Sequence, residues 1–156
     1  MKTYPYPAGK SMVKWISTEW LGDHLNDENV MILDVQPNVH DYIMGHLPGA
    51  IYLNEGLLRS ANSGLPAVFV SPEVLQPVFR QVGLQPNKPV VIYSASGRYS
   101  KCTAGLGDGL EQTMMAYSLI RFGHNNVFIL DGGLEKWKQE GRELTKVFPS
   151  WEASSF

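Results

Sequence analysis

Short apolar runs that do not alternate with polar residues constrain the fold of this 156-residue chain more than any other feature. A strand that reads as continuous Val, Ile and Leu has both faces covered, which is typical of a parallel sheet flanked by helices. Such runs form the expected strands at residues 31–34, where the apolar run ends in Asp34, and at residues 51–53, 90–93 and 128–130. The sequence therefore predicts a central parallel sheet that contains these four strands.

Amphipathic stripes with capping signals lie between the apolar runs. Ser17 is a good N-cap for one helix, and Ser71-Pro72-Glu73 opens another with proline at its first position. The apolar positions of the last three helices are Val74, Leu75, Val78, Phe79 and Val82, then Met115, Leu119 and Phe122, then Leu134 and Trp137. Strands that alternate with helices predict βαβ units. The expected fold class is α/β, a doubly wound parallel sheet with helices on both faces.

The length fits one domain with a substantial core. We expect an N-terminal leader over residues 1–13, a folded domain over residues 14–146 and a C-terminal linker or docking tail over residues 147–156. The tail holds three aromatics, Phe148, Trp151 and Phe156, which are too many for a solvated end. We therefore predict that one of these rings packs on the domain surface, or on a second copy or domain.

Composition excludes several classes of function. The net charge of −2 leaves no electrostatic footprint for nucleic acid, and the apolar runs are too short to span a bilayer. No signal peptide is visible, and the single cysteine, Cys102, excludes an intramolecular disulfide, so a cytoplasmic protein is expected. The four histidines show no metal-ligand spacing, and the glycines at 105, 107 and 109 do not form a dinucleotide fingerprint. We expect neither a metal nor a cofactor.

The loop after the apolar run at 90–93 is the most informative segment. It spans residues 94–109, is rich in Gly and Ser, and leads into a helix that begins near residues 110–113. Backbone N–H groups in such a loop can turn inward and form a concavity that binds an anion. The residues expected to bind a small anion there are Ser96, Gly97, Arg98, Lys101, Gly105 and Gly107. The alternative is a surface loop with no ligand.

Three ordered motifs resemble the signatures of the rhodanese family. The first is Ile32-Leu33-Asp34-Val35 followed by residues 41–51, the second is the strand at 90–93, and the third is residues 122–133 with Trp137 and Gly141. The resemblance covers about residues 14–145. It is most like the amino-terminal half of tandem thiosulfate/mercaptopyruvate sulfurtransferases. That half resembles the catalytic half in fold but lacks the nucleophile.

The resemblance implies a chemistry that needs a thiolate at the first loop position. The thiolate takes a sulfane sulfur from a donor such as thiosulfate, becomes a persulfide and passes the sulfur to a thiophilic acceptor. Here that position holds Ser94, whose hydroxyl cannot carry a persulfide. Gly97 matches the family loop, but the loop is longer than usual. Cys102 is a candidate nucleophile if the loop folds back; otherwise it is an ordinary loop residue.

Three further residues fall in the resembling motifs. His46 lies in the Gly-His-Leu-Pro-Gly-Ala turn, where we expect it to bind backbone groups and fix the turn. Asp34 ends a strand and is expected to cap the following turn. Gln36 stands where the family often has Arg, so we expect no charged pair between it and Asp41.

The resemblance implies a sulfurtransferase that uses Cys102 or works with another domain. The alternative is a catalytically inactive module that packs on or regulates a partner domain. A phosphatase-like oxyanion site is the weakest hypothesis, because such enzymes also need a cysteine at residue 94. The implied partners are a small sulfur-containing anion and a second rhodanese domain or a homo-oligomer, with no nucleic acid and no membrane.

Overall fold

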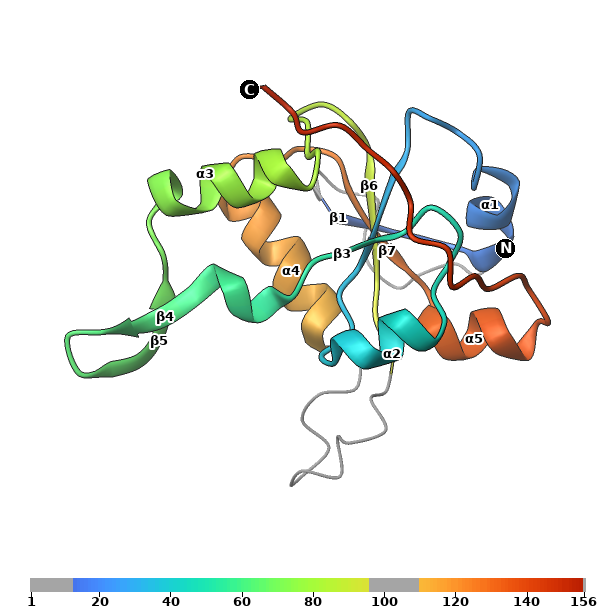
Figure 1. Cartoon of the computed structure of the whole chain (residues 1–156), viewed down its shortest axis with the longest axis horizontal. Coiled ribbons are helices and arrows are strands. Elements are labelled where there is room, and N and C mark those ends of the chain that lie inside the picture. Colours follow the sequence, from blue (N-terminus) through green and yellow to red (C-terminus); the bar gives the residue numbers. More distant parts are fainter. Residues whose placement is uncertain (1–12, 96–109, 156) are drawn as a thin grey trace.

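The computed structural model of the chain describes residues 13–95 and 110–155, and at its centre lies a five-stranded sheet. The strands are β1 (Val13–Ile16), β2 (Met31–Asp34), β3 (Ile51–Tyr52), β6 (Val90–Tyr93) and β7 (Val127–Leu130). Their order is β1-β7-β6-β2-β3, and every pairing is parallel (Figure 1). The predicted parallel sheet is confirmed, and β6 lies at its middle.

Five helices surround the sheet in the described part of the chain. They are α1 (Thr18–Asp23), α2 (Val39–Met44), α3 (Pro72–Gln81), α4 (Leu110–Arg121) and α5 (Gly133–Gln139). The Ser17 hydroxyl accepts a hydrogen bond from the Trp20 amide at 3.1 Å, so the predicted N-cap is present. No helix among the described residues is long and apolar enough to cross a membrane.

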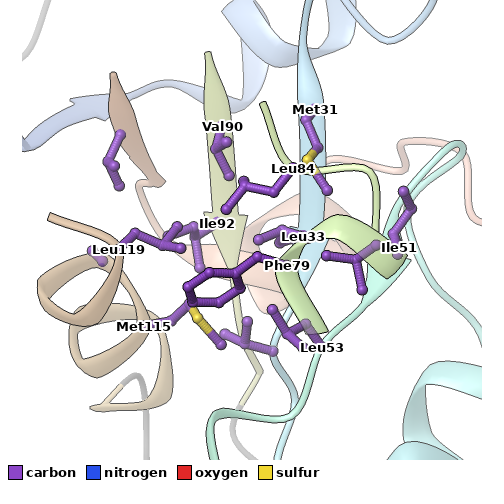
Figure 2. Packing of buried hydrophobic residues seen from close by; sticks show 14 of the residues in the cluster. Met31, Leu33, Ile51, Leu53, Phe79, Leu84, Val90, Ile92, Met115 and Leu119 are labelled. Carbon is purple, nitrogen blue, oxygen red and sulfur yellow. The ribbon is translucent and has the colours of Figure 1, made fainter. Parts of the chain in front are cut away.

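Two apolar cores form, one on each face of the sheet. Met31 and Leu33 of β2 pack with Phe79 of α3 and Met115 of α4, as Figure 2 shows. The residue between them in β2, Ile32, points to the opposite face, because successive side chains of a strand alternate. That second core includes Leu21 of α1 together with Leu134 and Trp137 of α5. Both faces are covered, as the non-alternating runs predicted.

One position of the predicted stripe on α3 is not part of the core. Leu75 and Phe79 are buried, whereas Val74 keeps 58 % of its surface exposed. Val74 lies one residue before Leu75, about 100° around the helix, and faces outward. The stripe on α3 is therefore narrower than the sequence indicated.

Several elements were not expected from the sequence. β1 pairs with β7 at one edge of the sheet, and α2 is a helix of six residues. A 3-10 turn, η1 (Glu55–Leu58), leads into an antiparallel hairpin of β4 (Arg59–Asn62) and β5 (Leu65–Phe69). The hairpin extends from the body of the domain (Figure 1). At its base, the guanidinium carbons of Arg59 and Arg121 each lie 4.9 Å from the centroid of the Phe69 ring. The Arg59 contact lies within the hairpin, and the Arg121 contact joins the hairpin to α4.

The C-terminal segment crosses the surface from α5 toward the end of α3 (Figure 1). Phe148 stacks near Tyr42 of α2, with ring centroids 6.0 Å apart. The Trp151 indole donates to the carbonyl of Gln81 at 2.8 Å. Ser154 donates from its amide to the carbonyl of Arg80 and from its hydroxyl to that of Leu84, at 2.8 and 2.6 Å. Phe148 and Trp151 thus contact the domain surface, while Phe156 lies outside the described residues.

Candidate functional site

Ser94 directly follows β6, at the carboxyl end of the middle strand, and is 2 % exposed. In open α/β sheets this end of the strands is where ligands bind. The Ser94 hydroxyl lies 3.4 Å from the carboxylate oxygen Oε2 of Glu111, in the first turn of α4. It also lies 3.4 Å from the carbonyl of Ala95. Both distances are long for a hydroxyl donor, so neither acceptor holds the proton strongly.

The start of α5 approaches the same residue from the side. The Leu134 amide donates to the Ser94 carbonyl at 3.0 Å. This contact requires glycine at residue 133, since a Cβ there would lie 2.6 Å from the Ser94 carbonyl oxygen. Gly133 also has φ +56°, a conformation that side chains disfavour. The N-termini of α4 and α5 therefore both meet the strand end that carries Ser94.

Asp34 ends the neighbouring strand, opposite Tyr93 in the parallel register, and is fully buried. Its Oδ1 accepts from the Gln36 amide at 2.9 Å, which closes the turn after β2. Its Oδ2 accepts from the Gln36 side-chain amide at 2.8 Å and from the Tyr93 hydroxyl through a short hydrogen bond. Burial raises the pKa of Asp34, and the three hydrogen bonds offset only part of that effect.

Gln36 changes the electrostatics of this turn. The Gln36 side chain is 2 % exposed and its neutral amide binds Asp34. Residue 36 therefore supplies no positive charge to the nearby carboxylates. Among the described residues, Oδ2 of Asp41 is buried without a hydrogen-bond partner. Burial is the main cause that raises the pKa of the Tyr52 phenol. The nearby carboxylates of Asp34 and Asp41 raise that pKa further. The surroundings of the turn after β2 are therefore acidic.

His46 is completely buried beside the C-terminal segment. Its Nδ1 lies 2.8 Å from the carbonyl of Tyr42, and its Nε2 lies 3.1 Å from the carbonyl of Val147. The backbone of His46 also exchanges two hydrogen bonds with Thr145, at 3.0 and 2.9 Å. His46 thus contacts backbone groups of α2 and of the segment that follows α5.

The structure brings some candidate residues together and does not describe others. Ser94 and Asp34 lie at the carboxyl ends of adjacent strands. His46 connects to them indirectly, because the amide of Leu47 donates to the Tyr93 hydroxyl at 3.1 Å. The expected anion-binding residues and the candidate nucleophile lie outside the described residues: Ser96, Gly97, Arg98, Lys101, Cys102, Gly105 and Gly107.

Two residues at this strand end were missed by sequence reasoning. Glu111 was visible as an acid in the first turn of the helix that follows the loop, and Gly133 as the second glycine of a Gly-Gly pair. Neither signal shows by itself that the residue contacts Ser94. Within the ranges that the structure describes, no group of three or more His, Cys, Asp or Glu side chains is placed to hold a metal.

A parallel sheet with helices on both faces, whose middle strand ends at a buried position between two helix N-termini, defines a rhodanese-type α/β domain. The family model for the rhodanese-like domain matches residues 17–140, and the chain belongs to that family. A crystal structure of a 3-mercaptopyruvate sulfotransferase from Escherichia coli has the same fold. It superposes with a TM-score of 0.76 at 24 % identity, covering 92 % of this chain and 54 % of that one.

Curated relatives carry names from sulfur metabolism. A putative thiosulfate sulfurtransferase of Synechococcus elongatus is 34 % identical over 149 residues, which is 96 % of this chain and 43 % of the relative. A 3-mercaptopyruvate sulfurtransferase of Escherichia coli is 27 % identical over 81 % of this chain and 44 % of its own length. A sulfur carrier protein of Thermus thermophilus is 29 % identical, with 87 % and 43 % covered. This chain spans less than half the length of these relatives.

Proposed function

We propose that this chain functions in rhodanese-type sulfur transfer. A sulfane sulfur passes from a small anion such as thiosulfate to a thiophilic acceptor through a cysteine persulfide. Membership of the rhodanese-like family supports this function, as do the names of the sulfurtransferase relatives. The observation that carries the proposal is the place of Ser94, buried at the carboxyl end of β6 where α4 and α5 meet it.

The persulfide in this proposal forms on Cys102, the only thiol of the chain. A serine hydroxyl at residue 94 forms no persulfide, so residue 94 contributes the surroundings of the site and not the nucleophile. The anion is held by the loop residues Ser96, Gly97, Arg98, Lys101, Gly105 and Gly107. We further propose that the protein acts in the cytoplasm, where a lone cysteine stays reduced.

A second candidate function is a catalytically inactive module that packs on a second rhodanese domain or on another copy of itself. The serine at residue 94, buried at the carboxyl end of β6, favours this candidate. A serine hydroxyl there forms no persulfide, so the position carries no nucleophile for sulfur transfer. In this role the chain supports sulfur transfer on a cysteine that its partner supplies.

Intact mass spectrometry after incubation with thiosulfate tests the proposal. The wild-type chain and the Ser94→Ala variant are expected to gain about 32 Da, the mass of one sulfur atom on a nucleophile. Cys102→Ser is the matched control and is expected to gain nothing. Treatment with cyanide should remove the added mass and release thiocyanate.

A wild-type chain that gains no sulfur would exclude the Cys102 route and leave the second candidate. That candidate is then tested by mixing the chain with the remaining half of a full-length relative and measuring thiocyanate formation. Faster thiocyanate formation with the chain than without it would favour the second candidate, a module that assists a catalytic partner domain. The proposal is wrong if the chain neither gains sulfur nor changes the rate of the other half.

A further inference from the structure

His124 lies in the turn between α4 and β7, at the end of the sheet opposite Ser94, and is 4 % exposed. Its Nδ1 accepts a hydrogen bond from the Asn126 amide at 3.3 Å, so the neutral ring carries its proton on Nε2. Nε2 donates to the carbonyl of Gln85 at 3.0 Å, in the turn between α3 and β6. The carbonyl of Lys88, in the same turn, is a further acceptor for the ring. The neutral imidazole therefore joins the two turns that precede β6 and β7.

The turn between α3 and β6 also binds the C-terminal segment, which passes beside it (Figure 1). The Ser154 hydroxyl donates to the carbonyl of Leu84 at 2.6 Å. The indole of Trp151 packs at Gly83, where an added Cβ would lie 3.2 Å from the ring carbon Cδ1. The buried ring of His124 thus binds this turn from the interior, and the C-terminal segment binds it from the surface.

The surroundings of the His124 ring are apolar. A cavity of about 60 Å³ borders the ring, and its apolar lining consists of Phe79, Leu84, Pro86, Leu119 and Phe122. Of the nearby cations, Lys88 meets the ring through its carbonyl, and Arg121 of α4 lies over the ring of Phe69. Burial lowers the pKa of His124, and the hydrogen bonds to the carbonyls of Gln85 and Lys88 offset only part of that effect. This environment therefore favours the neutral ring.

We propose that His124 is a pH-sensitive contact that keeps the C-terminal segment bound to the domain when neutral and releases it when protonated. The proposal goes beyond sulfur transfer and does not depend on it. A second proton on the ring would be carried by Nδ1, which faces the Asn126 amide, so two donors would meet and that hydrogen bond would be lost. The imidazolium would also be a charge among apolar side chains. The ring is therefore expected to gain its proton by leaving this position, which frees the turn that carries Leu84 and weakens its contact with Ser154.

The direction of the pH dependence follows from the lowered pKa of His124. When the turn opens, the ring meets water and regains its ordinary pKa of 6.5, whereas in the closed turn its pKa is lower. Between these two values the opened state binds more protons than the closed state. Opening is therefore expected to become more favourable as the pH falls below 6.5, by up to about tenfold per pH unit, until the pH passes below the pKa of the closed state.

Amide hydrogen exchange of the full chain, measured between about pH 8 and about pH 5, tests the proposal. The reporters are the Ser154 amide, which donates to the carbonyl of Arg80, and the Lys88 amide, which closes the turn. Each exchange rate is divided by the intrinsic rate at the same pH, so that the result is the equilibrium constant for opening. The variant His124→Gln keeps a neutral side-chain donor that does not titrate. His40→Gln is the matched control, because His40 is exposed on α2.

In the wild type and in His40→Gln, the opening constant of both amides is expected to rise toward about tenfold per pH unit below pH 6.5. In His124→Gln it should vary much less with pH. His46 contacts the carbonyl of Val147 in the same segment, but it is present in all three proteins, so its contribution cancels in the comparison. Equal pH dependence in the wild type and in His124→Gln would overturn the proposal.

A second measurement covers the case in which His124→Gln does not fold, because it uses the wild-type chain alone. The ring protons of His124 are titrated by NMR, and their midpoint is expected below pH 6.5. The exchange of the Trp151 indole N–H, which donates to the carbonyl of Gln81, is followed in the same samples. Its protection is expected to fall as the ring gains its proton. A midpoint at or above pH 6.5, or an indole whose protection does not change, would overturn the proposal.

Discussion

Replacing Gly133 by alanine tests the close contact between α5 and the strand end that carries Ser94. Gly133 has φ +56°, which costs an L-residue about 1–2 kcal/mol. The added Cβ would lie 2.6 Å from the carbonyl oxygen of Ser94, so the backbone of α5 or of β6 must move. Forcing an extra group into a packed interior costs about 1–3 kcal/mol.

The two costs together predict a loss of about 2–5 kcal/mol of unfolding free energy in Gly133→Ala. For a domain of this size the corresponding fall in Tm is about 10 °C. Gly141→Ala is the matched control, because Gly141 has φ +67° but nothing within 4 Å of its added Cβ. That variant bears the conformational cost alone, with a Tm lower by about 5 °C.

Thermal and urea unfolding, followed by circular dichroism, measure both variants. The difference between them isolates the collision with Ser94. If Gly133→Ala melts at or above the temperature of Gly141→Ala, α5 does not press against Ser94 as described. The reasoning about the site would then lose its geometric basis.

Three further predictions concern groups away from this contact. Burial raises the native pKa of Asp34 above its ordinary value of 3.8, so between these two values the native state binds more protons than the unfolded state. Stability is therefore expected to fall as pH rises through that window, and Asp34→Asn should remove this part of the decline in urea titrations; an unchanged decline would contradict it. Deleting residues 147–156 should cost at least about 2 kcal/mol, from four hydrogen bonds of about 0.5–1.5 kcal/mol each. A truncated chain that unfolds at the same urea concentration would show that the segment contributes nothing. His46→Phe keeps an aromatic ring against Tyr42 but removes the ring nitrogens that contact the carbonyls of Tyr42 and Val147, so we expect a loss of about 1–3 kcal/mol by the same assay. Wild-type stability in that variant would refute the role of these two contacts.

The buried strands of the sheet were predictable because both of their faces are covered. Residues 31–33 and 90–93 read as continuous apolar runs, and the structure pairs the two strands that contain them in parallel register. The hairpin of β4 and β5 was not predictable from that pattern, since its residues are mostly exposed and do not alternate. The helix α2 is also too short for a helical stripe to stand out.

The position of the candidate site in the fold was predictable from the sequence, but the residues that contact Ser94 there were not. The end of the strand at residue 93 and the serine that follows it were visible in the sequence. The contact between Ser94 and Glu111 joins residues 17 positions apart. The hydrogen bond between Ser94 and Leu134 joins residues 40 positions apart. Such long-range contacts depend on how two helices seat on the sheet, which local patterns do not specify.

The hydrogen bonds between residues 151–154 and the end of α3 have a consequence for local unfolding. The last carbonyls of a helix have no partner within the helix, and here Trp151 and Ser154 bind those of Arg80 and Gln81. Release of the segment would return the Gln81 carbonyl to water and take one of its donors from the Arg80 carbonyl, which the Gly83 amide also binds. The segment and the final turn of α3 therefore belong to one cooperative unit. In hydrogen exchange, the amides of both should open together, with a free energy below that of global unfolding.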